Sequence, residues 1–278
     1  MPDGPGCLFV VSTPIGNLGD ISLRAIETLR QVGIIAAEDT RHTRKLLTHH
    51  GISARMVSYH SHNRRVRIGQ LLQALSQGDV ALVTDAGTPV VSDPGQELVH
   101  AAASAGHQVL AIPGASALTA AVAVSGIQSD VLHFIGFLPR RRTERQRLLK
   151  TMAAWPGALA CFEAPHRLIA TLEDLETVFG ERQIAVCNEL TKLFENVFRG
   201  TIPEAIERFT SHPPRGEFTL VVELPGEAPA PAARTETDID ARFGALVAEH
   251  GDRKRALAAL AAETSMPRKE LYARLMSG

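Results

Sequence analysis

Four acidic side chains stand where a carboxylate could do acid–base chemistry. Glu38 and Asp39 end an apolar run in "AAEDTRHTRK", directly before a cationic segment, while Glu163 occurs in "FEAPHR" and Glu189 in "CNELTK". A carboxylate beside a ligand can accept a proton as a general base, whereas one that pairs with nearby arginines only supports the scaffold. We expect a scaffold role for at least one of Glu38 and Asp39, and the sequence does not rank the others.

The segment "LFVVSTPIGNLGDIS", residues 8–22, has the order of a nucleotide-binding unit: an apolar strand, a glycine-containing turn and a helix start. Its Gly16 and Gly19 do not form G-x-G-x-x-G, and no G-K-[ST] follows. The backbone N–H groups therefore lack the spacing that converges on a pyrophosphate. A ligand at this turn is not expected to be held by a phosphate cradle.

A second glycine-containing turn follows an apolar run in "LVTDAGTPVVSDPG". Asp85 ends the run, and Gly87 leaves room for a ligand or another backbone to approach closely. A tight strand-to-helix turn with Asp85 as a local cap explains the same residues about equally well. The eleven histidines form no H-x-x-x-H pair on a convincing helix, so the sequence predicts no metal site.

Strands and helices that would position these residues alternate along the first part of the chain. Strand-like runs at 8–11, 80–84 and 109–112 are each followed by a helical pattern, at 21–31, 94–105 and 115–124. This alternation predicts parallel strands with crossover helices, which bring the residues after each strand to one edge of the sheet. Asp93 is predicted to cap the helix at 94–105, with Pro94 in its first turn, Gln96 completing a capping box and Gly106 ending it.

The alternation starts again later and predicts a second α/β unit. Strands are expected at 158–162, 184–188 and 218–224, and helices at 168–179 and from Pro203. A stretch rich in Pro and Ala then reads as a linker, and the last residues carry Ala and Leu at helical spacing, broken by Pro267. That tail is similar to a helix-turn-helix, although a plain helical hairpin is the commoner outcome. The expected parts are 1–113, 114–225, the linker 226–238 and the helical tail 239–278.

The composition excludes several classes of protein. The 278 residues carry 29 Lys+Arg and 30 Asp+Glu, so the chain is not basic all over. Local cationic clusters are either solvated faces or, taken together, contacts for a polyanionic partner. Cys7, Cys161 and Cys187 are far apart in apolar runs, and we expect them to be buried, reduced cysteines of a cytosolic protein. The sequence shows no signal peptide and no apolar stretch of membrane-spanning length, so no membrane association is expected.

Several motifs, taken in their order and spacing, resemble the tetrapyrrole methylase superfamily: "TPIGNLGDISLRA", "AEDTR", "TDAGTPVVSDPG", "PGASA", "FIGFLPR", "FEAPHR", "ELTK" and "GEFTLVVE". The resemblance covers about Cys7 to Glu223. Within the superfamily the chain is similar to the bacterial enzymes that methylate the ribose 2′-hydroxyl of a cytidine in 16S (small-subunit) ribosomal RNA. The resemblance implies two α/β domains with a cofactor cleft between them, a small helical tail, a homodimer and a cytoplasmic location.

The same resemblance implies that S-adenosylmethionine binds in the cleft. This cofactor carries no phosphate, which explains why a pyrophosphate cradle is missing. Carried over by motif, the implied cofactor contacts are Pro14, Ile15, Asp85, Ala86, Gly87, Thr88, Ser116, Ala117, Phe162, Ala164, Asn188 and Thr219.

The implied partner is 16S ribosomal RNA or the small ribosomal subunit. The arginines expected to contact its phosphates are Arg41, Arg44, Arg64, Arg65, Arg140, Arg141 and Arg142. Phosphate contacts position a strand without reading its bases, and with only 5% aromatic residues a stacking platform is not expected.

Two alternative functions remain. The first is methylation of a tetrapyrrole ring, which has no use for the basic turn at 140–147. The second is a non-catalytic RNA-binding or ribosome-assembly protein, against which the intact "TDAGTP" and "PGAS" speak.

Overall fold

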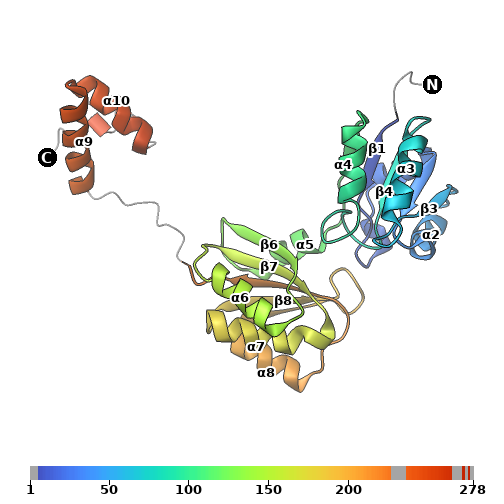
Figure 1. The fold of residues 1–278 in the computed structure, drawn as a ribbon. Helices are drawn as coiled ribbons and strands as arrows, with labels where there is room; N and C mark the ends of the chain where they lie inside the picture. Colours follow the sequence, from blue (N-terminus) through green and yellow to red (C-terminus); the bar gives the residue numbers. More distant parts are fainter. Residues whose placement is uncertain (1–5, 227–235, 265–270, 273–274, 276–278) are drawn as a thin grey trace. The chain divides into compact units, whose positions relative to one another are not determined.

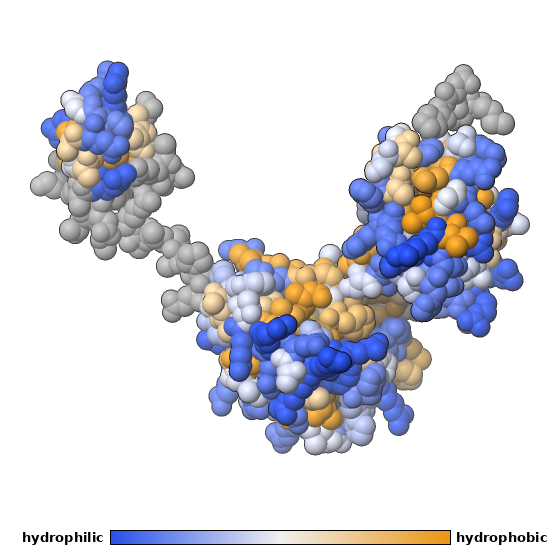
Figure 2. Space-filling view, viewed as in Figure 1, coloured by the Kyte–Doolittle hydropathy of each residue, from blue (hydrophilic) through white to orange (hydrophobic). Residues whose placement is uncertain are grey.

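The computed structural model describes residues 6–226, 236–264, 271–272 and 275. The chain separates into two compact units, residues 1–227 and 228–278, which are described one at a time (Figure 1). The larger unit contains two five-stranded sheets, and the smaller one contains helices. Hydrophilic side chains cover most of the face shown in Figure 2, with smaller hydrophobic areas between them.

The first sheet is wholly parallel, as the alternation of strands and helices predicts. Its strand order is β3-β2-β4-β1-β5, and the strands are β1 (Leu8–Val11), β2 (Ile34–Ala37), β3 (Met56–Ser58), β4 (Val80–Val83) and β5 (Val109–Ile112). The central strands read as continuous apolar runs because both faces of the sheet are covered. The helices α1 (Leu23–Gln31) and α2 (Thr40–His49) cover one face, and α3 (Arg64–Leu75) and α4 (Gln96–Ser104) cover the other. The residues that follow β1, β2 and β4 therefore meet at one edge.

In this half, side chains cap the starts of α1 and α2, whereas α3 and α4 begin without a side-chain cap. Ser22 accepts a hydrogen bond from the N–H of Ala25 at 3.1 Å and so begins α1 after the short 3-10 turn η1 (Leu18–Asp20). The predicted cap of α4 is wrong. The N-cap is Gly95, no side chain caps this helix, and α4 begins at Gln96. Asp93 is therefore left free of a capping role.

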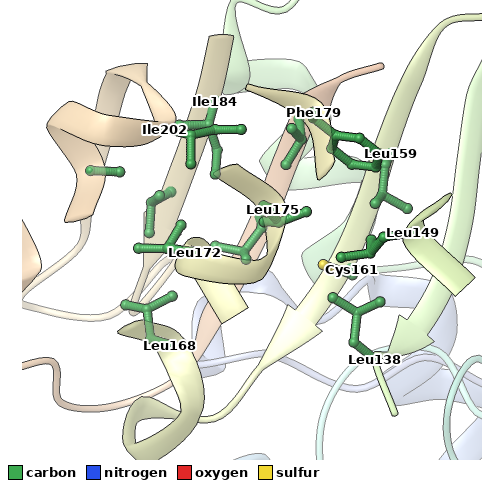
Figure 3. Packing of buried hydrophobic residues seen from close by; sticks show 14 of the residues in the cluster. Leu138, Leu149, Leu159, Cys161, Leu168, Leu172, Leu175, Phe179, Ile184 and Ile202 are labelled. Carbon is green, nitrogen blue, oxygen red and sulfur yellow. The ribbon is translucent and has the colours of Figure 1, made fainter. Parts of the chain in front are cut away.

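The second sheet is mixed, with the order β6-β7-β10-β8-β9, and only the β6–β7 pair is parallel. Its strands are β6 (Leu132–Phe137), β7 (Ala158–Glu163), β8 (Gln183–Asn188), β9 (Asn196–Thr201) and β10 (Phe218–Glu223). The helices α6 (Arg142–Met152), α7 (Leu168–Phe179) and α8 (Ile202–Ser211) pack on one face, and the 3-10 turn η2 (Pro165–Arg167) precedes α7. Figure 3 shows this core, in which Leu172 and Leu175 of α7 lie among strand residues such as Leu159 and Ile184.

The other face of the second sheet is covered by α5 (Ala117–Ser125), although this helix directly follows the first sheet along the chain. Its Ala121 is fully buried in an apolar cluster with Ala160 of β7 and Val221 of β10. Ile15, from the loop after β1, belongs to the same cluster. The two sheets are therefore joined by packing around α5, and the predicted boundary at 113/114 stays a prediction.

The smaller unit contains α9 (Glu236–His250) and α10 (Arg253–Thr264). Leu246, Ala256, Leu260 and Leu271 form a buried apolar cluster within it. Residues 227–235 of the predicted linker 226–238 lie outside the described residues, and α9 begins at Glu236, inside the predicted linker. Pro267, the predicted break in the tail, also lies outside the described residues.

The cysteines and the helices bear on the chain as a whole. Cys7, Cys161 and Cys187 are free and buried, as expected. Within the described ranges, none of the helices combines the length and apolar character that crossing a membrane requires.

Candidate active site

The loop between β4 and α4 has an unusual backbone. Gly87 and Gly95 adopt positive φ values of 77° and 144°, and so do two residues that are not glycine, Val90 (79°) and Ser92 (66°). A β-branched residue at positive φ is strained, and such strain persists only where surrounding packing holds it, often beside a functional site. Backbone hydrogen bonds of 2.9 and 3.0 Å between Gly87 and Thr13 join this loop to the one after β1.

These joined loops border a cavity of about 380 Å³. Further lining residues come from the start of α5, from the ends of β6, β7 and β8, and from the turn before β10. The volume lies within the range of about 300–1,000 Å³ that is usual for small-molecule sites. Nine of the predicted cofactor contacts line it: Ile15, Ala86, Gly87, Thr88, Ser116, Ala117, Phe162, Ala164 and Thr219.

The other three predicted contacts, Pro14, Asp85 and Asn188, lie outside this lining. The carboxylate of Asp85 accepts a hydrogen bond from the N–H of Asp39 at 3.1 Å. The amide of Asn188 donates to the carbonyl oxygen of Glu217 at 3.2 Å. Asp85 and Asn188 thus support the loops around the cavity, and a direct contact of these three residues with a cofactor stays a prediction.

One part of the cavity wall is aromatic. The rings of Phe137 and Phe162, which line the cavity, are 5.7 Å apart between centroids, and Phe134 packs behind them at 5.1 Å from Phe162 without lining the cavity. Phe137 is 56% exposed although it belongs to strand β6, because it faces the cavity. Together with the aliphatic Ile15 and Leu190 these rings offer a surface for a flat apolar group.

The start of α5 offers hydrogen-bond donors to the cavity. Ser116 is the N-cap residue, but its side chain makes no capping hydrogen bond to the helix. Both Ser116 and Ala117 line the cavity. The free N–H groups of a helix start, with the helix dipole, favour an anionic group such as a carboxylate.

Of the four predicted catalytic carboxylates, only Glu163 lines the cavity. Its side chain is fully buried, accepts hydrogen bonds from the Thr171 hydroxyl at 2.6 Å and the Ala164 N–H at 2.8 Å, and forms an ion pair with Arg167 at 3.2 Å. Every oxygen of this carboxylate therefore has a partner within the protein.

Glu189 accepts hydrogen bonds from Lys192 at 2.9 Å and from the N–H of Glu217 at 3.0 Å. Burial raises the pKa of Glu189, but these hydrogen bonds and the Lys192 charge outweigh it, so the pKa is lowered overall. A carboxylate with a lowered pKa is a weak base. The geometry favours a role for Glu189 in holding the turns together.

Glu38 and Asp39 differ sharply from each other. Asp39 caps α2 through the N–H of Arg41 at 2.8 Å and pairs with the Arg41 guanidinium at 2.7 Å, which holds the pKa of Asp39 well below its usual range. This is the scaffold role expected for at least one of the pair. Burial, followed by the charge of Asp85, raises the pKa of Glu38, whose carboxylate accepts a hydrogen bond from the Asp85 N–H at 3.4 Å.

Sequence reasoning missed a fifth carboxylate, Asp93. It lines the cavity, and burial together with the charges of Glu38 and Asp85 raises its pKa to about 7. The residue stands in the quoted "SDPG", but the adjacent helix pattern favoured a capping role. Other lining residues that were not predicted as cofactor contacts are Val91, Ser92, Phe137, Glu163, Pro165, Cys187, Leu190, Gly216, Glu217 and Phe218.

The cationic segment before and within α6 divides into two kinds of arginine. Arg145 is buried and donates to the carboxylate of Asp174 at 2.7 Å, and Arg142 donates to the other oxygen of Asp174 at 2.9 Å. These two side chains hold α6 against α7. Arg140 and Arg141 are exposed, and Arg141 pairs only loosely with Glu144, at 3.5 Å.

The remaining predicted RNA contacts lie in the first half of the larger unit. Arg41 pairs with Asp39 as described, and Arg64 pairs with Glu97 at 3.0 Å. Arg44 and Arg65 are exposed and form no ion pair with another described residue. Contact of these arginines with phosphates stays a prediction.

No metal centre is formed by the part of the chain that the structure describes. Its His, Cys, Asp and Glu side chains form no group of three or more that could hold an ion.

Comparison with known proteins gives three findings. The family model described as tetrapyrrole (corrin/porphyrin) methylases matches residues 7–206. The ribosomal RNA small subunit methyltransferase I of Synechocystis sp. is 48% identical over 271 residues, which are 96% of this chain and 96% of that protein. The protein of the same name from Thermotoga maritima is 45% identical over 218 residues, which are 78% of this chain and 98% of that protein.

Solved structures are similar in fold. The X-ray structure of a cobalamin biosynthetic enzyme, cobalt precorrin-4 methyltransferase, superposes with a TM-score of 0.61 at 15% identity, covering 78% of this chain and 94% of that one. At this level of identity the likeness concerns the fold alone.

Proposed function

This chain belongs to the tetrapyrrole (corrin/porphyrin) methylase family, and from that premise we propose that it is an S-adenosylmethionine-dependent methyltransferase of small-subunit ribosomal RNA. The proposed reaction is methylation of the ribose 2′-hydroxyl of a cytidine in 16S ribosomal RNA. The observation that carries the proposal is the 48% identity, over 96% of both chains, to a protein named for methylation of small-subunit ribosomal RNA.

The residues of the cavity fit S-adenosylmethionine. The aromatic and aliphatic wall with Phe137, Phe162 and Ile15 would hold the adenine, and the free donors at Ser116 would hold the carboxylate of the methionine part. Asp93, which has no ion-pair partner among the described residues, places a carboxylate on the wall of a site that would receive a cationic ligand. None of these features requires a phosphate.

When bound, the cofactor supplies a methyl group that is already activated for transfer. The protein's task is therefore mainly to hold acceptor and donor in line, which can account for a large part of a rate enhancement. The strained loop with Val90 and Ser92 and the packing of Ile15 against α5 give the cavity the rigidity that this alignment needs.

The polyanionic substrate would be held outside the cavity. Arg140 and Arg44 are exposed and available for phosphates, and they would position the strand without reading its sequence. On family resemblance alone we extend the proposal to a homodimer in the cytoplasm. Analytical ultracentrifugation of the purified chain tests the dimer.

Transfer of labelled methyl groups tests the proposed function directly. The protein is incubated with radiolabelled S-adenosylmethionine and, in parallel, with small ribosomal subunits, free 16S ribosomal RNA and a tetrapyrrole precursor. We expect label in the ribosomal substrate and its recovery as 2′-O-methylcytidine after digestion to nucleosides. Label in the tetrapyrrole alone, or in a methylated base, contradicts the proposal.

A further inference from the structure

We propose that Asp93 is the general base of this site, the group that takes the proton from the attacking ribose hydroxyl. The inference rests on the proposed function, because it concerns the proton that must leave when an alcohol is methylated. Asp93 is not among the four carboxylates that the sequence predicts as catalytic candidates. Its assignment depends on its place on the cavity wall, on the loop that holds it there and on the partners of the other acids.

The loop between β4 and α4 fixes Asp93 at the cavity. Ser92 directly before it has a φ of 66°, and a Cβ on Gly136 of β6 would lie 2.5 Å from the Ser92 hydroxyl oxygen, so strand and loop are in close contact. Gly95, two residues after Asp93, has a φ of 144°. A Cβ placed on Gly95 would lie within 3 Å of the side chains of Leu82 and Val90. Ser92 before it and Gly95 after it are thus held by packing, and Asp93 lines the cavity instead of capping α4.

The other acids on the cavity wall are already paired. Glu163 has its three partners from β7, η2 and α7. Glu217 forms an ion pair with Lys192 at 2.8 Å. Asp93 forms no ion pair with any described residue, so it is the wall carboxylate that can exchange a proton without breaking one.

The charges around Asp93 suit a base that works near neutral pH. Burial, then the negative charges of Glu38 after β2 and Asp85 after β4, raise its pKa to about 7. Burial raises the pKa of Glu38, and the charge of His60, after β3, lowers it in part. Across the cavity, Glu163 is paired with Arg167 and Glu217 with Lys192. A base whose pKa lies near the working pH combines adequate strength with a sufficient deprotonated fraction.

In this step the ribose hydroxyl loses its proton to Asp93 and gains the methyl group. The O–H bond of the ribose breaks, its proton forms an O–H bond with a carboxylate oxygen of Asp93, and the electron pair stays on the ribose oxygen. That oxygen forms the new O–C bond to the methyl carbon, while the C–S bond breaks and its pair stays on sulfur. The carboxylate and the sulfonium both become neutral, and the proton later passes from Asp93 to water.

The kinetic test measures methyl transfer to small ribosomal subunits between about pH 5 and pH 9. Wild-type kcat should fall below an apparent pKa near 7, since the base must be deprotonated. Asp93→Asn should lower kcat by about 10²- to 10⁴-fold and abolish this dependence, and Asp93→Glu should recover part of the rate. The matched control Glu27→Gln removes an exposed carboxylate from α1 and should leave rate and profile unchanged.

A second readout does not depend on activity. Because the folded state binds the Asp93 proton more tightly than the unfolded chain, this group stabilises the fold below about pH 4 and that contribution is lost as the pH rises towards 7. Asp93→Asn should therefore have a higher Tm than the wild type at about pH 8, with the difference disappearing on acidification. Calorimetry should show that the variant still binds S-adenosylmethionine.

The outcomes separate the two proposals. Absence of transfer by the wild type at every pH overturns the proposed function and with it the step assigned to Asp93. Transfer by the wild type together with an equal rate and equal pH profile for Asp93→Asn overturns only the role of Asp93. A variant that is inactive but has a lower Tm than the wild type at pH 8, or has lost cofactor binding, assigns Asp93 a structural role and also overturns it.

Discussion

At the scale of single residues, Gly87 is the position where a side chain and the proposed cofactor would compete for the same space. Its φ is 77°, and a Cβ there would lie 3.4 Å from Cγ2 of Ile15 on the cavity wall. We expect Gly87→Leu to fill part of the cavity and to weaken S-adenosylmethionine binding by about 1–3 kcal/mol, roughly 5- to 150-fold. Isothermal titration calorimetry measures the change.

Backbone strain at Gly87 needs its own control, which Gly106 provides. Its φ is 82° and a Cβ there would meet nothing within 4 Å. Gly106→Leu should therefore lose a similar amount of thermal stability while its affinity for the cofactor stays unchanged. Normal affinity in a folded Gly87→Leu protein would place the cofactor elsewhere.

The pair of Arg145 and Asp174 is the residue-scale contact on which packing of α6 depends. Their side chains are 5% and 0% exposed. Arg145→Ala leaves a buried carboxylate with only Arg142 and Gln146 as partners, so we expect a loss of about 3 kcal/mol in the free energy of unfolding, the low end for a broken buried pair. Urea denaturation measures it. Exposed Arg147 on the same helix is the control, and equal losses for Arg147→Ala would contradict this account.

At the scale of elements, the segment that leads into α6 combines an arginine that packs against α7 with two exposed arginines. Arg142 forms an ion pair with Asp174, whereas the side chains of Arg140 and Arg141 are exposed. If these two arginines neutralise phosphates, their joint replacement by alanine should weaken RNA binding. The slope of log K against log salt should fall by up to about 0.7–0.9 for each lost contact.

Filter binding to 16S ribosomal RNA at several salt concentrations measures this slope, and calorimetry should show unchanged cofactor affinity. Arg208→Ala, which removes an exposed arginine of α8 outside the predicted set, is the control. An unchanged slope in the double variant would make Arg140 and Arg141 part of an ordinary solvated face.

At the scale of the whole molecule, the smaller unit is expected to be separable from the larger one. Leu246, Ala256, Leu260 and Leu271 form a core within it, so these side chains are used inside the unit. The relative from Thermotoga maritima is shorter than this chain. The 218 aligned residues make up 98% of that protein but only 78% of this chain. The larger unit already contains both sheets and every residue that lines the cavity.

Truncation at about Ala232 should therefore leave a folded protein that still binds S-adenosylmethionine. We expect it to methylate small subunits poorly, with a higher KM and a nearly unchanged Tm, because the smaller unit helps to dock a large RNA surface. Steady-state kinetics and thermal unfolding of the truncated and full chains measure both quantities. A lowered Tm would instead indicate packing on the larger unit or on a second copy, and full activity would contradict both roles.

The sequence by itself determined the elements whose signals are local. The strands at 8–11 and 109–112 and the helix at 168–179 have the predicted bounds, because apolar runs and helical periodicity are properties of neighbouring residues. Weak signals were missed: β3 is only three residues long, and β6 and β9 have few fully buried side chains. Spaced motifs also identified the family and nine of the residues that line the cavity.

The tertiary structure decided which charged residues are available for chemistry. Asp39 and Glu189 are held by cations close to them in the chain, and Arg145 is held by Asp174 across 29 positions. The charges that act on Asp93 are Asp85 of its own loop and Glu38, which follows another strand. A carboxylate's strength as a base depends on burial and on charges brought near by folding. For Asp93 one of those charges, Glu38, comes from a distant position in the chain, so the local pattern around "SDPG" does not distinguish a helix cap from a base.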